Sequence, residues 1–110
     1  MRYTLHAPGA VAGDITQVGW NSGRRRKNLV NIPAAGGSQP ATPIAYLAHT
    51  RAELVASNEG IQGGLPITPA AGLVTFHDWT GDCYAVCSPE GVIADITSEE
   101  ERSPEWNSNR

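Results

Sequence analysis

Residues 73–96 constrain the fold most, because two short turn sequences divide them into three apolar runs. The turns are Thr-Gly-Asp at 80–82 and Pro-Glu-Gly at 89–91. In the second turn Pro89 presets φ, and Gly91 accepts the left-handed φ that a three-residue hairpin loop requires at its end. The segment is therefore predicted to form three antiparallel strands paired in sequence order.

Counting outward from the turns places Trp79 opposite Cys83 and Ser88 opposite Val92. Alternate side chains of a strand point to opposite faces, and a slip by one residue would exchange the faces. The first face is predicted to be core and carries Val74, Phe76, Tyr84, Val86, Val92, Ala94 and Ile96. The second, chemically mixed face carries Thr75, His77, Trp79, Cys83, Ala85, Cys87, Ile93 and Asp95.

Two further strand regions precede this segment. Residues 2–6 alternate in polarity and are predicted to form a short first strand. Residues 14–32 are predicted to form a hairpin that turns at Asn-Ser-Gly, 21–23, with period-two apolar residues on both sides of the turn.

A short helix is predicted near 51–58. Thr50 and Glu53 match a capping box, in which each side chain satisfies a free backbone N–H, and Gly60 is placed to end the helix. Residues 43–49 fit either a strand or a helix, and a single helix over 43–58 is the alternative.

Two Gly/Pro-rich loops, 33–42 and 60–72, separate these elements. Pro-Ala-Ala-Gly occurs in both, at 33–36 and at 69–72. Because the four residues are common ones, we interpret the repetition as coincidence rather than as a duplicated unit.

The predicted fold class is α+β and mainly antiparallel β, in a single domain over residues 1–103 with a frayed polar tail at 104–110. Ala contributes 14 residues and Gly 12, whereas Leu, Ile, Val and Phe together contribute 21. Because Ala and Gly bury little area each, the core is thin, and oligomerisation could supplement it.

Charge is divided unequally along the chain. The first 55 residues carry six basic and two acidic side chains, and the remaining 55 carry two basic and nine acidic ones. Such asymmetry indicates either a charged partner or a fold in which one half of the chain faces the other, within the chain or across a subunit contact. We favour the second interpretation.

The mixed face contains the only candidates for catalysis. His77 and Asp95 would lie in one cross-strand row about 10 Å apart, with a small alanine between them. Cys83 and Cys87 are four strand positions, roughly 13 Å, apart, which excludes a disulfide between them and disfavours a shared metal ion. An enzyme using His77 with Cys83, Cys87 or Asp95 is therefore a minor alternative, and neither metal nor cofactor is expected.

Arg24, Arg25, Arg26 and Lys27 form the strongest electrostatic feature. Adjacent cations stay solvated or meet an anion, so the run could bind a nucleotide or nucleic acid, with Trp20 stacking on a base. The acidic balance of the whole chain, with a net charge of −3, disfavours nucleic acid.

Trp79 and Ile93 on the mixed face, together with Trp20, are typical of an interface anchored by aromatic side chains. The leading functional hypothesis is therefore a non-enzymatic protein-interaction or assembly module that binds itself or another protein. Binding of an anionic ligand through Arg24–Lys27 is the second hypothesis. The chain has no apolar run long enough to span a membrane and no signal peptide, so a cytoplasmic location is expected.

Overall fold

The computed structural model describes residues 1–8, 15–20, 25–54, 56–57, 60–61 and 64–100. The strands are β1 (Arg2–Thr4), β2 (Thr16–Gly19), β3 (Arg26–Asn31), β4 (Ile44–Ala48), β5 (Ala56–Ser57), β6 (Gly60–Ile61), β7 (Leu65–Ile67), β8 (Val74–Trp79), β9 (Cys83–Ser88) and β10 (Ile93–Glu100). Two 3-10 helices, η1 (Arg51–Leu54) and η2 (Pro69–Ala71), precede β5 and β8.

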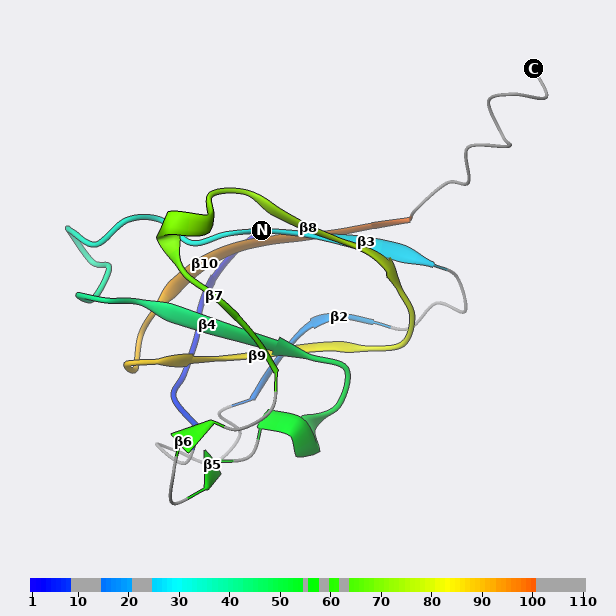
Figure 1. Cartoon of the computed structure of the whole chain (residues 1–110), viewed down its shortest axis with the longest axis horizontal. Helices are drawn as coiled ribbons and strands as arrows, with labels where there is room; N and C mark the ends of the chain where they lie inside the picture. Colours follow the sequence, from blue (N-terminus) through cyan, green and yellow to red (C-terminus); the bar gives the residue numbers. More distant parts are fainter. Residues whose placement is uncertain (9–14, 21–24, 55, 58–59, 62–63, 101–110) are drawn as a thin grey trace.

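Eight strands form two antiparallel four-stranded sheets, in the orders β1-β10-β3-β8 and β2-β9-β4-β7. The sheets lie one above the other as two layers (Figure 1). The first four strands pair in reverse order with the last four: β1 with β10, β2 with β9, β3 with β8 and β4 with β7. This arrangement, in which successive strands mostly alternate between the sheets, is that of a jelly roll.

The main core lies between the two sheets, because alternate side chains of every strand point inward. Alanines hold three of its positions, Ala45, Ala85 and Ala94. Its buried members are Leu5, Val18, Val30, Ile32, Ala45, Leu47, Ile67, Trp79, Cys83, Ala85, Cys87, Val92, Ala94 and Ile96.

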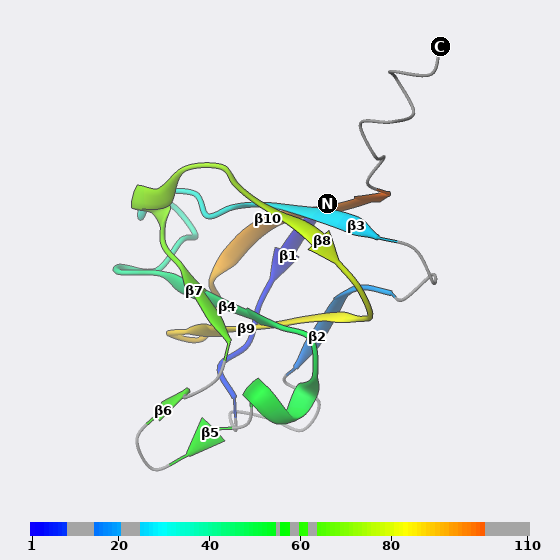
Figure 2. The same cartoon turned by 45° about the vertical axis from the view of Figure 1, so that its right-hand side comes forward.

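A second apolar cluster covers the outer face of the sheet that contains β4 and β9. Leu54 of η1, which is fully buried, packs there with Ala48 and Val86. Figure 2 shows η1 beside the end of β4, at the lower edge of this sheet. Both faces of β9 are therefore covered by apolar side chains.

The prediction that residues 73–96 pair in sequence order is wrong. β8 and β10 belong to one sheet, where β3 separates them, and β9 belongs to the other. The turns at 80–82 and 89–91 carry the chain from one sheet to the other. The predicted strand boundaries are close to the observed ones, but the pairing partners come from the first half of the chain.

The predicted faces are correct for β10 and inverted for β9. Ala94 and Ile96 are buried in the main core, as expected. In β9, however, Ala85 and Cys87 point into the main core, whereas Val86 points outward toward η1. Because both faces of β9 are buried, hydrophobicity alone did not identify the inner one.

The hairpin predicted over 14–32 is also wrong, because β2 pairs with β9 in one sheet and β3 pairs with β10 and β8 in the other. Its turn at 21–23 lies outside the described residues.

Residues 43–49, which fitted either a strand or a helix, contain β4, so the helix over 43–58 is wrong. The helix expected near 51–58 is only the 3-10 helix η1, after which β5 begins at Ala56. The fold is therefore β-rich, with almost no helix in the described residues, and none of its helices is long and apolar enough to cross a membrane.

Candidate functional site

The structure does not bring the proposed catalytic residues together. His77 is exposed on β8, and Asp95 lies on β10, with β3 between the two strands. Arg2 of β1 donates two hydrogen bonds to Asp95, from Nε to Oδ1 at 2.8 Å and from Nη2 to Oδ2 at 3.0 Å. These hydrogen bonds lower the pKa of the Asp95 carboxyl. The prediction that His77 and Asp95 lie in one cross-strand row is wrong, and Asp95 forms an ion pair with Arg2 instead.

The two cysteines are free thiols on the inner face of β9. Burial raises the pKa of Cys83 to about 12 and also raises the pKa of Cys87. The Cys87 thiol donates a hydrogen bond to the Pro89 carbonyl at 3.0 Å. Both thiols are therefore protonated at neutral pH, which is unfavourable for a nucleophile. Among the described residues, no three His, Cys, Asp or Glu side chains are grouped so that they could hold a metal ion.

The basic run begins with Arg24, which lies outside the described residues. The next residue, Arg25, donates from Nη1 to Asp78 Oδ1 at 2.9 Å. This exposed ion pair joins the β3 end to β8, so one cation of the run is matched by a carboxylate of the acidic half of the chain.

The two cations that follow lie on β3 opposite the acidic end of β10. Arg26 is directly opposite Glu100, and Lys27 is directly opposite Glu99. Opposite charges at such positions attract across the two strands. The structure thus supports the interpretation that the halves of the chain complement each other in charge, and it leaves less net positive charge for an external anion.

The aromatic anchors differ in accessibility. Trp20, at the end of β2, is 59% exposed, whereas Trp79 is only 4% exposed and belongs to the main core. Ile93 is half-buried, and its backbone N–H donates to Gln39 Oε1 at 2.7 Å. The expectation that Trp79 lies on an exposed sheet face is therefore wrong.

A β-bulge turns Trp79 inward. Asp78 has φ of 56°, in the left-handed region, and the β3–β8 register shifts beside it. The extra residue reverses the alternation of side chains along β8, so Trp79 points to the same inner face as Phe76. His49 stacks on the Trp79 ring with centroids 3.9 Å apart, and Trp79 Nε1 donates to the Asp82 carbonyl at 3.1 Å.

Sequence reasoning missed Gln39, a buried residue of the loop 33–42. Its Nε2 donates to the Pro33 and Ile93 carbonyls, both at 2.9 Å, while its Oε1 accepts from the Ile93 N–H. A single amide thus attaches the loop to β10. No pattern in the sequence distinguishes this glutamine from an exposed one.

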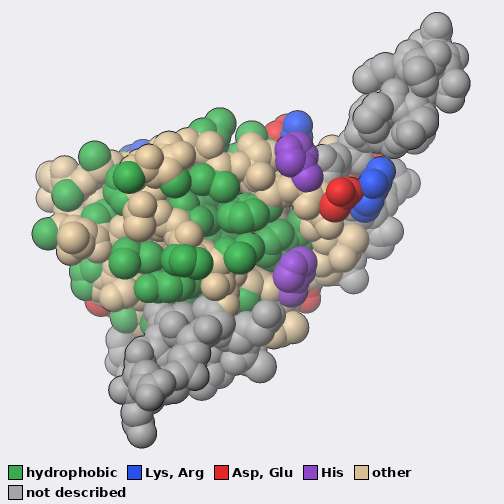
Figure 3. All heavy atoms as spheres, in the orientation of Figure 1, with side chains coloured by type: hydrophobic (Ala, Val, Ile, Leu, Met, Phe, Trp, Pro, Cys, Tyr) green, Lys and Arg blue, Asp and Glu red, His purple; other side chains and the backbone are tan. Residues whose placement is uncertain are grey.

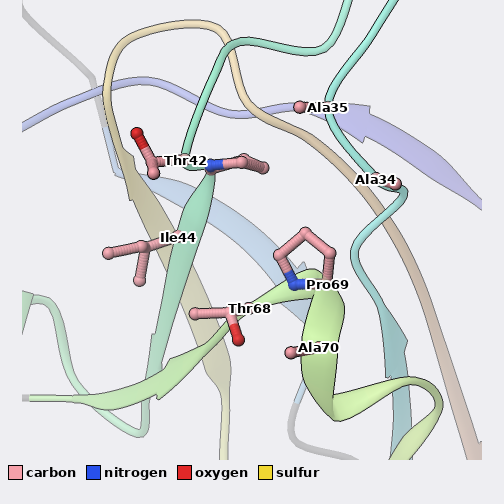
Figure 4. Close-up of a pocket in the computed structure, with 8 residues that line it drawn as sticks. Ala34, Ala35, Thr42, Ile44, Thr68, Pro69 and Ala70 are labelled. Atoms are coloured by element: carbon pink, nitrogen blue, oxygen red, sulfur yellow. The ribbon is translucent and has the colours of Figure 1, made fainter.

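The loop helps to form an apolar pocket of about 310 Å³. Three chain segments supply its walls: the residues after β3, the start of β4, and the β7–η2 junction (Figure 4). The lining residues are Ala34, Ala35, Thr42, Pro43, Ile44, Thr68, Pro69 and Ala70. Both Pro-Ala-Ala-Gly copies contribute residues to these walls.

One wall of the pocket holds a strained residue. Thr42 has φ of 47° and directly precedes Pro43. A β-branched residue rarely adopts this φ, and a following proline restricts it further, so the conformation costs about 1–3 kcal/mol. Strain of this kind is often kept where it shapes a functional surface.

The pocket lies on the side of the molecule bordered by the edge strands β7 and β8, which we call the β7–β8 face. Leu65 in β7 is 45% exposed, and Leu73, immediately before β8, is 65% exposed. In Figure 3 apolar side chains cover the middle of the visible face, and the visible charged side chains lie at its margins. The β7–β8 face is therefore the strongest candidate for a binding surface.

Comparison of the chain with protein-family profiles, with curated protein sequences and with solved structures gives no match.

Proposed function

We propose that the chain is a protein-interaction module that self-associates through the β7–β8 face. The observation that carries this proposal is that two exposed leucines, Leu65 and Leu73, lie on either side of η2, which lines an apolar pocket, while the visible charged side chains lie at the margins of the face in Figure 3. Depletion of charge around an apolar centre is typical of interface cores, and contiguous exposed apolar surface is uncommon on monomers.

The β7–β8 face is complementary to itself, which favours a second copy of the chain as the partner. Leu73 projects from the residues that follow η2, and Pro69 and Ala70 of η2 line the pocket. An exposed side chain and a recess so close together allow a two-fold contact in which each copy inserts Leu73 into the pocket of the other. A cavity of about 150 Å³ holds a benzene ring, so a pocket of about 310 Å³ has room for a leucine side chain.

The edge strands favour contacts through side chains over the addition of a strand. β7 has only three residues, and its centre is Pro66, which has no backbone N–H to donate. β8 carries the bulge at Asp78 near its end. Both features interrupt the regular row of backbone groups that an added strand would need.

Self-association also accounts for the thin core. The interior contains Ala45, Ala85 and Ala94, and each of them buries less apolar area than a larger side chain would. Covering Leu65 and Leu73 in a dimer would add apolar burial that a single copy lacks.

Light scattering coupled to size-exclusion chromatography tests the proposal. The wild-type chain is expected at about twice its single-chain mass of 11.7 kDa across the micromolar range. Leu73→Glu should shift it toward the single-chain mass, because a carboxylate cannot be buried unpaired in an apolar pocket.

Thr4→Glu is the matched control, since it adds the same charge at an exposed position of β1 in the other edge of the sheet. This variant should retain the wild-type mass. A wild-type chain of 11.7 kDa at all concentrations, or equal loss of mass in both variants, would overturn the assignment to the β7–β8 face.

A further inference from the structure

We infer that a buried water molecule binds between the sheets, held by Asn28 of β3 and Ser98 of β10. Asn28 is 1% exposed, yet neither its Nδ2 nor its Oδ1 has a hydrogen-bond partner among the described residues. Ser98 Oγ is likewise buried and unpartnered there. Nearly all buried side-chain polar atoms in proteins have a partner, so three orphaned atoms in one place indicate a bound group.

Backbone pairing places the two side chains together. Ser98 is directly opposite Asn28 in the β3–β10 ladder, so both side chains point to the same face of the sheet. Their neighbours two positions away, Val30 and Ile96, are buried in the main core. Asn28 and Ser98 therefore face the interior, toward the second sheet.

Gly19 of β2 forms the opposite wall. A Cβ at this position would lie 3.1 Å from the Cβ of Cys83 and 3.5 Å from Ser98 Oγ. The backbone of Gly19 therefore approaches the Ser98 hydroxyl without a side chain between them. On the other side, Phe76 is directly opposite Asn28 in the β3–β8 pair.

The chemistry of these groups selects a small neutral ligand. Asn28 offers two N–H donors and a carbonyl acceptor, and the Ser98 hydroxyl can both donate and accept. Cys83, which lies beside Gly19, has its pKa raised by burial to about 12 and is neutral. Water, which donates two hydrogen bonds and accepts up to two, satisfies all three orphaned atoms without burying a charge.

Water–protein NOE and ROE spectroscopy of the wild-type chain tests the site. A bound water should give cross-peaks of opposite sign in the two spectra at the Asn28 side-chain amide protons. Thr97→Ala is the control variant, because it removes an exposed hydroxyl from the same strand and leaves Asn28 and Ser98 unchanged. The cross-peaks should persist in this variant.

Absence of these cross-peaks in the wild-type chain, or their loss in Thr97→Ala, would overturn the inference. A second measurement uses thermal unfolding of variants. Asn28→Leu and Ser98→Ala should each lower the Tm. The double variant should lose less than the sum of these two decreases in Tm, since it removes every orphaned atom together. Strictly additive losses would contradict a shared water.

Discussion

The two open sides of the sandwich differ in how their edge strands are covered. On one side, residues 1–7 connect the two sheets: Leu5 N–H donates to the Val92 carbonyl at 2.8 Å, and Cys87 N–H donates to the His6 carbonyl at 3.0 Å. On the other side, β7 and β8 border an apolar face with exposed leucines and a pocket. We call the first side the closed edge.

Polar groups complete the closed edge. Glu90 accepts a hydrogen bond from the Ala7 N–H at 2.8 Å and contacts His6 Nδ1 at 2.6 Å, while Arg2 pairs with Asp95. Ion pairs and short strands are common devices that protect sheet edges from aggregation. The β7–β8 face has Pro66 and a bulge to block strand addition but retains its apolar surface. This difference is the one expected if the chain self-associates through the β7–β8 face, as proposed above.

Truncating a leucine on each side should give the largest difference in the free energy of unfolding. Leu5→Ala is expected to lower the free energy of unfolding by about 2–5 kcal/mol, because Leu5 is fully buried and its truncation leaves a cavity. Leu73→Ala should change it by no more than about 0.5 kcal/mol in the isolated chain. Urea unfolding at low protein concentration measures both values, and equal losses would remove the distinction between the sides.

The dependence of the Tm on protein concentration tests whether the β7–β8 face joins two copies. If the β7–β8 face joins two copies, the Tm of the wild-type chain should rise by a few degrees for each tenfold increase in concentration. Tenfold mass action contributes at most about 1.4 kcal/mol. Leu73→Glu should abolish this dependence, whereas Thr4→Glu should not. A wild-type Tm that is constant with concentration would count against association.

Thiol labelling tests how well the interior is sealed. Cys83 and Cys87 are both buried, and the pKa of Cys83 is raised to about 12. An aromatic disulfide reagent at pH 7 should therefore label the folded chain many times more slowly than the unfolded chain. Rapid labelling under native conditions would show that the interior opens readily.

The smallest effect concerns pH at the closed edge. The hydrogen bonds from His6 and from the Ala7 N–H lower the pKa of Glu90 below its ordinary value of 4.5. The carboxylate therefore adds stability above pH 4.5, and this contribution is lost as the pH falls through the lowered pKa. Glu90→Gln should be slightly less stable than wild type at pH 7 and equal to it near pH 2. A difference that grows on acidification would contradict this ion pair.

Local patterns predicted much of the strand content. β9 and β10 begin after the two turns that Gly81 and Gly91 mark, and both glycines have the positive φ that such turns favour. The same patterns did not predict pairing, since a short turn joins strands within one sheet or across two with similar residues. Trp79 shows the limit of these local patterns most clearly, because the bulge that buries it lies at Asp78, and no glycine marks that position in the sequence.

The candidate site was less predictable than the fold. Leu65 and Leu73 look like core residues in the sequence, and the pocket joins segments from positions 34 to 70. Gln39 anchors one of these segments by hydrogen bonds to residues up to 54 positions away. Long-range contacts of this kind leave no local periodicity.

The sequence by itself determined where strands and turns occur and how charge is divided, because local propensity and side-chain alternation act over a few residues. Only the tertiary structure decided which strands pair, which face of β9 is inner, and which apolar side chains remain outside. These choices depend on folding the first half of the chain back on the second. That arrangement aligns Lys27 with Glu99 and Arg26 with Glu100, and it leaves β7 and β8 as edge strands.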